Sequence, residues 1–321
     1  MPVQILRGDC RDVLKALPDE SVHCVVTSPP YWGLRDYGNG SCGIGLEETV
    51  AEHMEALTAL FRDVRRVLRA DGTLWLNYGD AYAGSWGAQG RGDKRSEMEI
   101  GGRIEGENRK NLSEQQILAH PKRRQTGSLS RTGGCKAKDL MGLPWQLAFA
   151  LRNDGWYLRQ DIIWAKPNPM PESVTDRCTK AHEYLFLLSK SERYFFDAAA
   201  IKTPFSAETK GLLSYAEKVR EAPPTGANKR SVWTVATEAF SEAHFATFPP
   251  ALIEPCIKAG CPTGGTVLDP FGGAGTTGLV ADRLQRNAIL IELNPEYADM
   301  AERRISRDGG LFATVENAHA Q

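Results

Sequence analysis

Hydrophobic and polar positions alternate along residues 1–80 in a way that predicts strands separated by helices. The apolar runs Val3–Leu6, Val22–Thr27 and Thr73–Asn77 each have the length of a strand. Between the last two, apolar side chains recur every three or four residues, which is the period of one helix face: Val50, Met54, Leu57, Phe61, Val64 and Leu68. Strand, helix and strand with short connections favour an α/β fold with a parallel sheet.

The same alternation resumes after residue 138. Apolar runs bounded by polar turns predict a helix, two strands and another helix, in this order: Leu143–Asn153, Trp156–Trp164, His182–Leu188 and Pro249–Ala259. No internal repeat is found. We therefore expect residues 1–321 to form one α/β domain.

Two sections, residues 84–138 and 203–230, lack a regular pattern. The first holds 12 Lys and Arg against 6 Asp and Glu, together with ten glycines. Such a segment cannot bury enough apolar surface to offset the entropy lost when it orders. We expect a basic, flexible insertion at 84–138 and a variable segment at 203–230.

A glycine-rich turn joins the short strand Thr266–Asp269 to a following helix. Gly273, Gly275 and Gly278 satisfy the spacing GxGxxG, in which glycines permit a tight turn and a close approach to a ligand. Alone, the pattern fits an ordinary strand-to-helix turn equally well. Glu292 ends the next strand, near the spacing from Asp269 that is typical of an acid accepting both ribose hydroxyls. An adenosine-containing cofactor is expected, although Glu292 could also cap the helix that begins near Pro295.

The position of this turn discriminates between cofactors. A dehydrogenase places its GxGxxG turn at the start of a βαβαβ half, whereas only one further clear strand follows here. Asp269-Pro270-Phe271 before the glycines is also unusual for a pyrophosphate loop. Both observations favour S-adenosyl-L-methionine over NAD, on a sheet whose motif order is permuted.

A second candidate site follows the strand Val22–Thr27. Ser28, Pro29, Pro30 and Tyr31 would lie at the carboxyl end of that strand, where open α/β sheets bind ligands. Prolines lack amide donors, so the Ser28 hydroxyl and the Pro29 carbonyl could together hold an NH2 group, while Tyr31 stacks on a planar base. A proline turn with Tyr31 in the core is the alternative.

Composition narrows the setting. The 39 Lys and Arg nearly balance the 40 Asp and Glu, and the net charge of −1 excludes a uniformly basic nucleic-acid coat. The N-terminal residues lack the sections of a signal peptide and no apolar run has membrane-spanning length, so a cytoplasmic protein is expected. Seven scattered cysteines without zinc spacing predict neither a bound metal nor a disulfide framework.

Together, Thr27–Tyr31 and Leu268–Thr277 resemble the DNA amino-methyltransferases, in the group whose catalytic motif precedes the S-adenosylmethionine motif. Shorter similar stretches cover most of the chain: Gly8–Cys10, Asp71–Leu76, Trp164–Lys166, Lys180–Tyr184 and His244–Pro249. The resemblance implies a doubly wound, mostly parallel, seven-stranded Rossmann-like methyltransferase sheet with helices on both faces. It also implies that 1–321 is a single methyltransferase catalytic domain.

The resemblance assigns roles to individual residues. Ser28, Pro29, Pro30 and Tyr31 would be catalytic. The cofactor would be bound by a larger set: Asp9, Cys10, Asp269, Pro270, Phe271, Gly272, Gly273, Gly275, Thr276, Thr277, Glu292, Phe245 and Thr247. Because variable segments carry target recognition in this family, DNA contacts are expected from Arg123, Arg124, Lys229 and Arg230. One departure is Phe248, which stands where a lysine is frequent.

The first catalytic position favours one target base. It is commonly Ser in enzymes that modify cytosine and Asp or Asn in enzymes that modify adenine. Ser28 therefore predicts methyl transfer to N4 of a flipped-out cytosine in double-stranded DNA, with N6 of adenine as the alternative. Pro255-Cys256, the dipeptide used in carbon-5 methylation, lies within a predicted helix and is assigned a structural role.

Other classes stay open on the sequence alone. An adenosine-nucleotide-binding module without catalysis, or a dehydrogenase, would use the glycine-rich turn and leave the Ser28 motif idle. For a methyltransferase, a bacterial or phage origin and association with the nucleoid are expected. A partner restriction endonuclease, and the choice between monomer and homodimer, are left undecided by the sequence.

Overall fold

The computed structural model describes residues 1–33, 43–83, 132–204, 226–238, 247–309 and 314–319. Most of the segments 84–138 and 203–230 therefore lies outside the described residues, as do Phe245, Arg123 and Arg124.

The chain divides into two compact units. The first comprises residues 1–29, 60–78 and 148–321, and it contains every described strand. The second comprises residues 30–59 and 79–147. The chain passes from the first unit to the second between Pro29 and Pro30, within the predicted catalytic motif.

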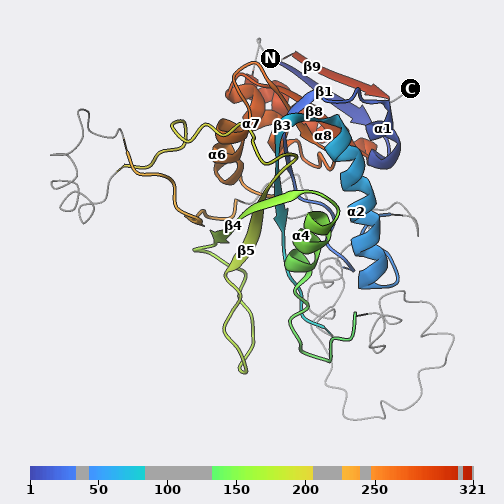
Figure 1. Cartoon of the computed structure of the whole chain (residues 1–321), viewed down its shortest axis with the longest axis vertical. Coiled ribbons are helices and arrows are strands. Elements are labelled where there is room, and N and C mark those ends of the chain that lie inside the picture. Colours follow the sequence, from blue (N-terminus) through green and yellow to red (C-terminus); the bar gives the residue numbers. More distant parts are fainter. Residues whose placement is uncertain (34–42, 84–131, 205–225, 239–246, 310–313, 320–321) are drawn as a thin grey trace, which may run out of the picture. The chain divides into compact units, whose positions relative to one another are not determined.

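One sheet of nine strands forms the centre of the first unit (Figure 1). Its strand order is β6-β4-β5-β3-β2-β7-β8-β1-β9. In chain order the strands are β1 (Pro2–Arg7), β2 (Val22–Thr27), β3 (Leu68–Tyr78), β4 (Tyr157–Ala165), β5 (His182–Ser189), β6 (Val232–Thr234), β7 (Thr266–Asp269), β8 (Asn287–Glu292) and β9 (Thr314–His319).

The pairing confirms the mostly parallel α/β class. Only β5 runs antiparallel to its neighbours β3 and β4, and the other pairs are parallel. The expected strand number was wrong, because seven strands were predicted and the sheet has nine. The additional strands are β6, only three residues long, and β9, at the two edges.

Helices α6 (Pro250–Gly260), α7 (Thr276–Arg283) and α8 (Pro295–Gly309) pack on the strands through one large apolar cluster. Within β2, Cys24 and Val26 belong to this cluster, whereas Val25 is equally buried but points to the opposite side. Consecutive burial along a strand requires cover on both of its faces. The central part of the sheet is therefore covered on both sides, as a doubly wound fold demands.

Helix α2 (Val50–Val67) follows the predicted apolar stripe. Every stripe residue from Val50 to Leu68 is buried. Arg66, near its C-terminal end, donates to the carbonyls of Leu14 and Leu17 at the end of α1 (Cys10–Ala16), at 2.6 and 2.9 Å. These contacts satisfy carbonyls at the C-terminal end of α1, where the Leu14 carbonyl also accepts from the Leu17 amide at 3.1 Å.

The ends of the two variable segments are held by short antiparallel bridges. Thr203 and Ala227 exchange two backbone hydrogen bonds of 2.9 Å, and an isolated bridge joins Tyr82 to Leu140. Each bridge thus brings together the two described residues or stretches that flank one variable segment.

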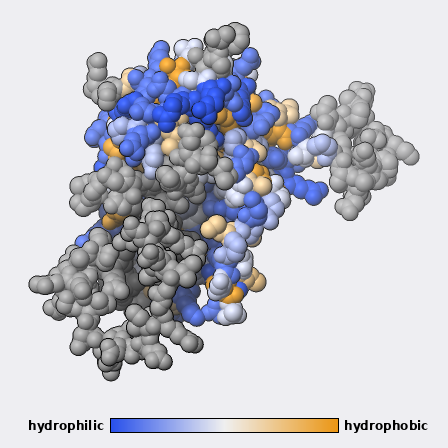
Figure 2. All heavy atoms as spheres, turned by 180° about the vertical axis from the view of Figure 1, so that it is seen from behind, coloured by the Kyte–Doolittle hydropathy of each residue, from blue (hydrophilic) through white to orange (hydrophobic). Residues whose placement is uncertain are grey.

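No helix of the described residues is long and apolar enough to cross a membrane. The face shown in Figure 2 carries mostly hydrophilic side chains, with hydrophobic ones scattered between them. Scattered apolar residues are ordinary on a protein surface and do not by themselves mark a binding site.

Candidate functional site

The sheet topology places the sequence motifs together at the carboxyl ends of neighbouring strands. Strands β2, β7, β8 and β1 are neighbours in this order and run parallel, so their carboxyl ends lie together. Ser28 follows β2, the glycine-rich loop follows β7, Glu292 ends β8, and Asp9 comes shortly after β1. Motifs from opposite ends of the sequence thus meet where α/β sheets bind ligands.

Asp269 joins two of these motifs through hydrogen bonds. Its side chain is buried, and it accepts hydrogen bonds from the hydroxyls of Thr27 at 2.6 Å and Thr277 at 2.7 Å. Its carboxylate also accepts from the amide of Phe271 at 3.0 Å. Burial raises the pKa of Asp269 to about 7, against the opposing effect of these hydrogen bonds. The carboxyl group thus fixes the end of β2 to the start of the glycine-rich loop.

The glycine-rich loop requires glycine at two positions for a backbone reason. Gly273 and Gly275 have φ of +50° and +75°, in the left-handed region that other residues disfavour. A Cβ on Gly275 would also approach the Cβ of Ala301 in α8 to 2.7 Å. The loop therefore has a fixed shape, and it lies tightly against α8.

Thr276 and Thr277 begin α7 but face inward. Both side chains are at most 3% exposed, and Thr276 accepts a hydrogen bond of 2.9 Å from Arg304 of α8. The same Arg304 nitrogen donates to the carbonyl of Ala274 at 3.0 Å. No sequence pattern pointed to Arg304, because its partners lie far earlier in the chain. The two hydroxyls thus hold the start of α7 in place through hydrogen bonds to Arg304 and Asp269.

Glu292 is the acid best placed for a ligand. Its carboxylate oxygens accept one backbone hydrogen bond each, from Gly273 at 2.7 Å and Asn294 at 2.8 Å. A carboxylate has about four acceptor sites, so hydroxyl donors can still bind. Burial raises the pKa of Glu292. The cap of α8 is Asn294, whose side chain accepts from the amide of Glu296 at 2.9 Å, so Glu292 does not cap that helix.

Asp9 and Cys10 follow β1 at the same edge. Asp9 caps α1 by accepting from the amide of Arg11 at 2.9 Å, and the Arg11 guanidinium lowers the pKa of this carboxyl group. Cys10 is buried, and burial raises the pKa of its thiol to about 12. The Cys10 thiol is therefore neutral.

The predicted catalytic motif spans the point in the sequence at which the chain passes from the first unit to the second. Ser28 is partly exposed and Pro29 is buried, both in the first unit. In the second unit, the ring of Tyr31 lies over Gly79, where an added Cβ would approach Tyr31 Cε2 to 2.6 Å. Gly79, which the sequence analysis did not single out, therefore makes room for the Tyr31 ring.

Neighbouring aromatic and sulfur side chains are structural. Trp32 is buried and donates to the Glu47 carbonyl at 3.0 Å, so it belongs to the core. Cys256 is fully buried in α6, and burial raises the pKa of its thiol well above the usual range. It therefore lacks the thiolate that a carbon-5 methylation nucleophile requires.

The remaining predicted residues lie before α6 and β6. Thr247 is partly exposed, and Phe248, in place of the frequent lysine, packs against the apolar cluster. Lys229 lies 4.8 Å over the ring of Trp233, and Arg230 is exposed. The described residues contain no group of three or more His, Cys, Asp or Glu side chains that could hold a metal ion.

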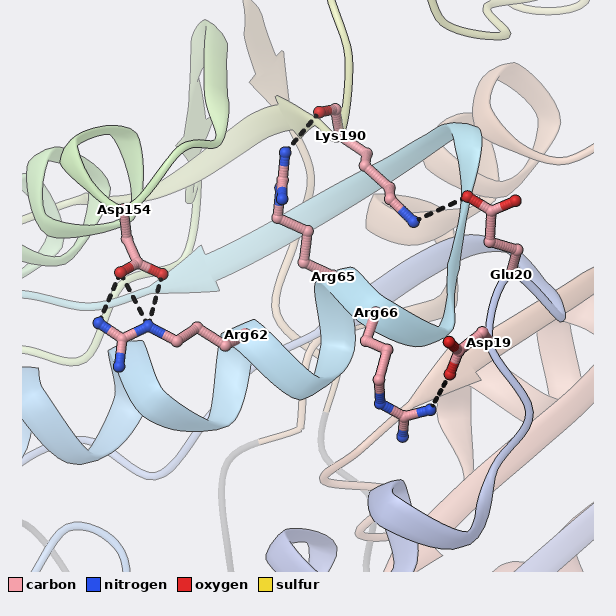
Figure 3. Close-up of a pocket in the computed structure, with 7 residues that line it drawn as sticks. All are labelled: Asp19, Glu20, Arg62, Arg65, Arg66, Asp154 and Lys190. Carbon is pink, nitrogen blue, oxygen red and sulfur yellow. Dashed lines mark hydrogen bonds and ion pairs between the residues drawn. The ribbon is translucent and has the colours of Figure 1, made fainter.

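A charged pocket lies at the other end of the strands, near the start of β2 (Figure 3). Its residues precede β2, lie on α2, or follow α4 (Leu143–Asn153) and β5, and they pair with one another. Arg62 binds both oxygens of Asp154 at 2.6 to 3.0 Å, and Lys190 binds Glu20 at 3.2 Å. This ion-pair network connects distant elements, and its location away from the motifs separates it from the candidate site.

The fold defines a class of protein: a mostly parallel α/β sheet of the Rossmann-like methyltransferase type, with the sequence motifs at the carboxyl ends of neighbouring strands. Residues 22–303 match the DNA methylase family, whose members are N6 and N4 methyltransferases. The chain therefore belongs to this family and is an S-adenosylmethionine-dependent DNA amino-methyltransferase, as its motifs predicted.

Relatives from restriction-modification systems are similar over nearly the full chain. Type II methyltransferase M.SmaI of Serratia marcescens is 47% identical, with 95% of this chain and 91% of the relative covered. Type II methyltransferase M.XycI of Xanthomonas campestris pv. cyanopsidis is 46% identical, with 94% and 87% covered.

Solved structures share the fold. PvuII DNA methyltransferase (cytosine-N4-specific) has a TM-score of 0.60 at 20% identity, over 99% of this chain and 96% of that one. A putative DNA modification methylase of Thermus thermophilus, complexed with S-adenosyl-L-methionine, has a TM-score of 0.58 at 22% identity, over 98% and 99%.

Proposed function

We propose that this enzyme methylates N4 of cytosine in double-stranded DNA. The observation that carries the proposal is Ser28, whose neutral hydroxyl follows the central strand β2 beside the cofactor loop. A carboxylate at this position would be the mark of an adenine enzyme. N6 of adenine is the second candidate, because both bases present an NH2 group beside a ring nitrogen.

The residues present fit S-adenosylmethionine. Glu292 retains free acceptor sites for ribose hydroxyls, and Gly273 brings the loop backbone close to that carboxylate. Leu293, directly after Glu292, is 41% exposed and offers an apolar surface for the adenine. The proposed binding set is the one that the motifs indicated, with Phe245 outside the described residues: Asp9, Cys10, Asp269, Pro270, Phe271, Gly272, Gly273, Gly275, Thr276, Thr277, Glu292, Phe245 and Thr247. When bound, the cofactor supplies an electrophilic methyl group.

The protein side of the reaction is positioning. The lone pair of an exocyclic amine is delocalised into its ring, so the amine is a poor nucleophile. If the Ser28 hydroxyl and the Pro29 carbonyl each accept one amine hydrogen, the nitrogen can become tetrahedral and direct its lone pair toward the methyl group. Tyr31 stacks on the flipped base, and the hydrogen bond from Thr27 to Asp269 fixes Ser28 relative to the loop.

DNA contacts complete the proposal. Non-specific affinity for DNA comes from Lys and Arg on phosphates, and the insertion 84–138 carries a surplus of six positive charges. We assign phosphate contacts to Arg123 and Arg124 there, and to Lys229 and Arg230 beside β6. We place the enzyme in the cytoplasm with its DNA, alongside a partner restriction endonuclease.

The test is to incubate the protein with mixed-sequence duplex DNA and labelled S-adenosylmethionine, then to identify the methylated nucleoside by mass spectrometry. N4-methylcytosine is expected. Ser28→Ala should lose most transfer, by about 100-fold or more if positioning fails, while its affinity for the cofactor stays within about twofold because Ser28 does not contact it.

N6-methyladenine as the sole product would overturn the cytosine assignment and leave the enzyme class intact. Full activity of Ser28→Ala would overturn the amine-holding mechanism instead. Glu292→Ala is the matched comparison, since it should weaken cofactor binding directly. The two variants therefore separate loss of chemistry from loss of the cofactor.

A further inference from the structure

The segment Lys166–Ala181, between β4 and β5, projects from the sheet as a narrow loop (Figure 1). Its ends are joined by a backbone hydrogen bond of 2.8 Å from Lys166 to Ala181. In its first limb, Met170 lies between Pro169 and Pro171 and is 85% exposed. Among the large hydrophobic side chains of the described residues, none is more exposed. We call this segment the finger.

The strand register shows that the finger begins beyond the carboxyl end of β2, which Ser28 follows. Thr27, at the end of β2, pairs with Leu76 in β3. Leu76 pairs with Phe186 in β5, and Phe186 pairs with Asp161 in β4, so these four residues lie in one row across the sheet. Strand β4 then continues to Ala165, about 13 Å further at about 3.3 Å per residue. The finger begins only there. It is three strand spacings, about 14 Å, to the side of Ser28.

The base of the finger is firmly held. Lys166 pairs with Glu183 and lies 4.2 Å over the ring of Trp164. Glu183 also accepts a hydrogen bond of 3.2 Å from Asn77, near the carboxyl end of β3. These contacts connect the finger to the strand next to β2, so its position relative to Ser28 is fixed.

The two limbs of the finger are held as well. The side chain of Asn168 exchanges hydrogen bonds of 2.9 and 3.2 Å with the backbone of Thr237. In the other limb, Arg177 donates to Glu172 at 2.6 Å. Between these contacts, the two prolines fix φ on each side of Met170. Met170 is therefore presented to solvent from the first limb, on a backbone that is held on both sides.

We propose that the finger is a DNA-contacting element whose exposed Met170 inserts into the duplex beside the target base and stabilises its extrahelical position. The inference rests on the DNA methyltransferase activity but not on the choice between cytosine and adenine. Methionine, proline and other apolar side chains are the residues that proteins insert between base steps. An unbranched methionine chain can fill the irregular space left in a base stack.

The location explains why a large apolar side chain is left uncovered. A base that reaches Ser28 must leave the duplex. The duplex itself must then lie beyond the carboxyl ends of the strands, on the side of the sheet from which the finger projects. Covering a water-exposed hydrophobic side chain with a stacked base lowers the free energy of the complex. Met170 can therefore serve DNA binding without loss of packing in the core.

The experiment compares Met170→Ala with the wild-type enzyme on a duplex carrying one methylation site and 2-aminopurine beside the target base. The variant should give a smaller fluorescence increase on binding, because less of the duplex is unstacked. Its kcat/KM for DNA should fall about tenfold, which corresponds to about 1.4 kcal/mol, while cofactor affinity stays unchanged. A mismatch opposite the target base should restore most of the lost rate, because an unpaired base leaves the stack readily.

Two further variants make the result specific. Met170→Leu should retain most activity, since it keeps an apolar side chain of similar size. Tyr157→Ala, at the other end of β4 and 44% exposed in the wild-type protein, removes an apolar side chain far from the finger and should leave the fluorescence change intact.

Wild-type fluorescence and rate in Met170→Ala would overturn the proposal. So would an equal loss of rate on paired and mismatched duplexes, because that would show a role other than base extrusion. If the wild-type enzyme itself methylated no DNA, the proposed function would fail instead, and the two failures are thus distinguishable.

Discussion

Asp269 shows how a single buried side chain can join two sequence motifs. The sequence motif indicated that it binds the cofactor, whereas its side chain is buried between Thr27 and Thr277. Thr277 has a second partner, the carbonyl of Val26 at 3.4 Å, so it can donate there and accept from a protonated Asp269. Both protonation states of the carboxyl group can therefore be accommodated.

The raised pKa of Asp269 predicts a pH dependence of stability. Between pH 4 and about 7 the unfolded chain has lost this proton and the folded chain retains it, so folding takes up a proton and stability falls as pH rises. Asp269→Asn removes the titration and preserves the shape. Relative to the variant, the wild-type protein should lose on the order of a few kcal/mol of unfolding free energy across this range.

Denaturant titrations at a series of pH values measure this difference, and parallel profiles of the two proteins would contradict it. Asp9→Asn is the control with the opposite sign. The Arg11 guanidinium lowers the pKa of Asp9, so the stability that Asp9 contributes is lost only as pH falls below about 4. Its difference from the wild-type protein should be flat above that pH.

At the scale of elements, the junction between β7 and α7 depends on Gly275. An alanine there would combine a disfavoured φ of +75° with a Cβ contact of 2.7 Å to Ala301. Gly264 has nearly the same φ, +78°, but nothing lies within 4 Å of an added Cβ. The two glycines therefore separate the cost of backbone strain from the cost of overlap between the loop and α8.

Gly264→Ala should destabilise the protein by about 1 kcal/mol through strain alone. Gly275→Ala should cost about 1–3 kcal/mol more, because the loop and α8 must move apart. The measurement is the unfolding free energy of both variants, with cofactor affinity determined in parallel. Equal destabilisation would show that α8 adjusts without cost.

The sequence pattern predicted the long elements because their packing is local and periodic. The α2 stripe is an example, since one buried face imposes the helical period. The pattern did not predict that β3 starts at Leu68, because the exposed residues Arg69 to Asp71 resemble a turn. It also missed β6 and β9, whose short or polar edge strands gain their stability from partners distant in the chain.

For the site, motif spacing located the loop, Glu292 and Ser28, because these lie at strand ends. Arg304 and Gly79 could not be found, since their roles depend on contacts across the fold. Asn294 before Pro295 did carry a signal, because Asn followed by Pro is a common start of a helix. That pair predicts Asn294, and not Glu292, as the cap of α8.

At the scale of the whole molecule, the net charge of −1 averages two unlike parts. The insertion 84–138 carries a surplus of six positive charges, which leaves −7 on the rest of the chain. An acidic body repels DNA at long range, so binding should depend on the few basic segments. The proposed role of the insertion can therefore be measured through its charge.

Replacing Arg123 and Arg124 by Gln should lower the slope of log affinity against log salt by about two, since each phosphate contact contributes about one. Fluorescence anisotropy with a duplex at several salt concentrations measures this slope. The same charge is removed by Arg303→Gln with Arg307→Gln, exposed on α8. An equal change in both double variants would attribute the effect to net charge and not to the insertion.

The pairing of β1 has a consequence for synthesis. Strand β1 pairs on one side with β8 and on the other with β9. Val3 can therefore pair with Ala288 only after most of the chain has been synthesised. At roughly 5–20 residues per second, a ribosome takes about 15–60 s to reach that point. For this time the first strand has two open edges and the half-made chain cannot close the cofactor pocket. A nascent chain is therefore exposed to misassociation, and it stays inactive until translation is nearly complete.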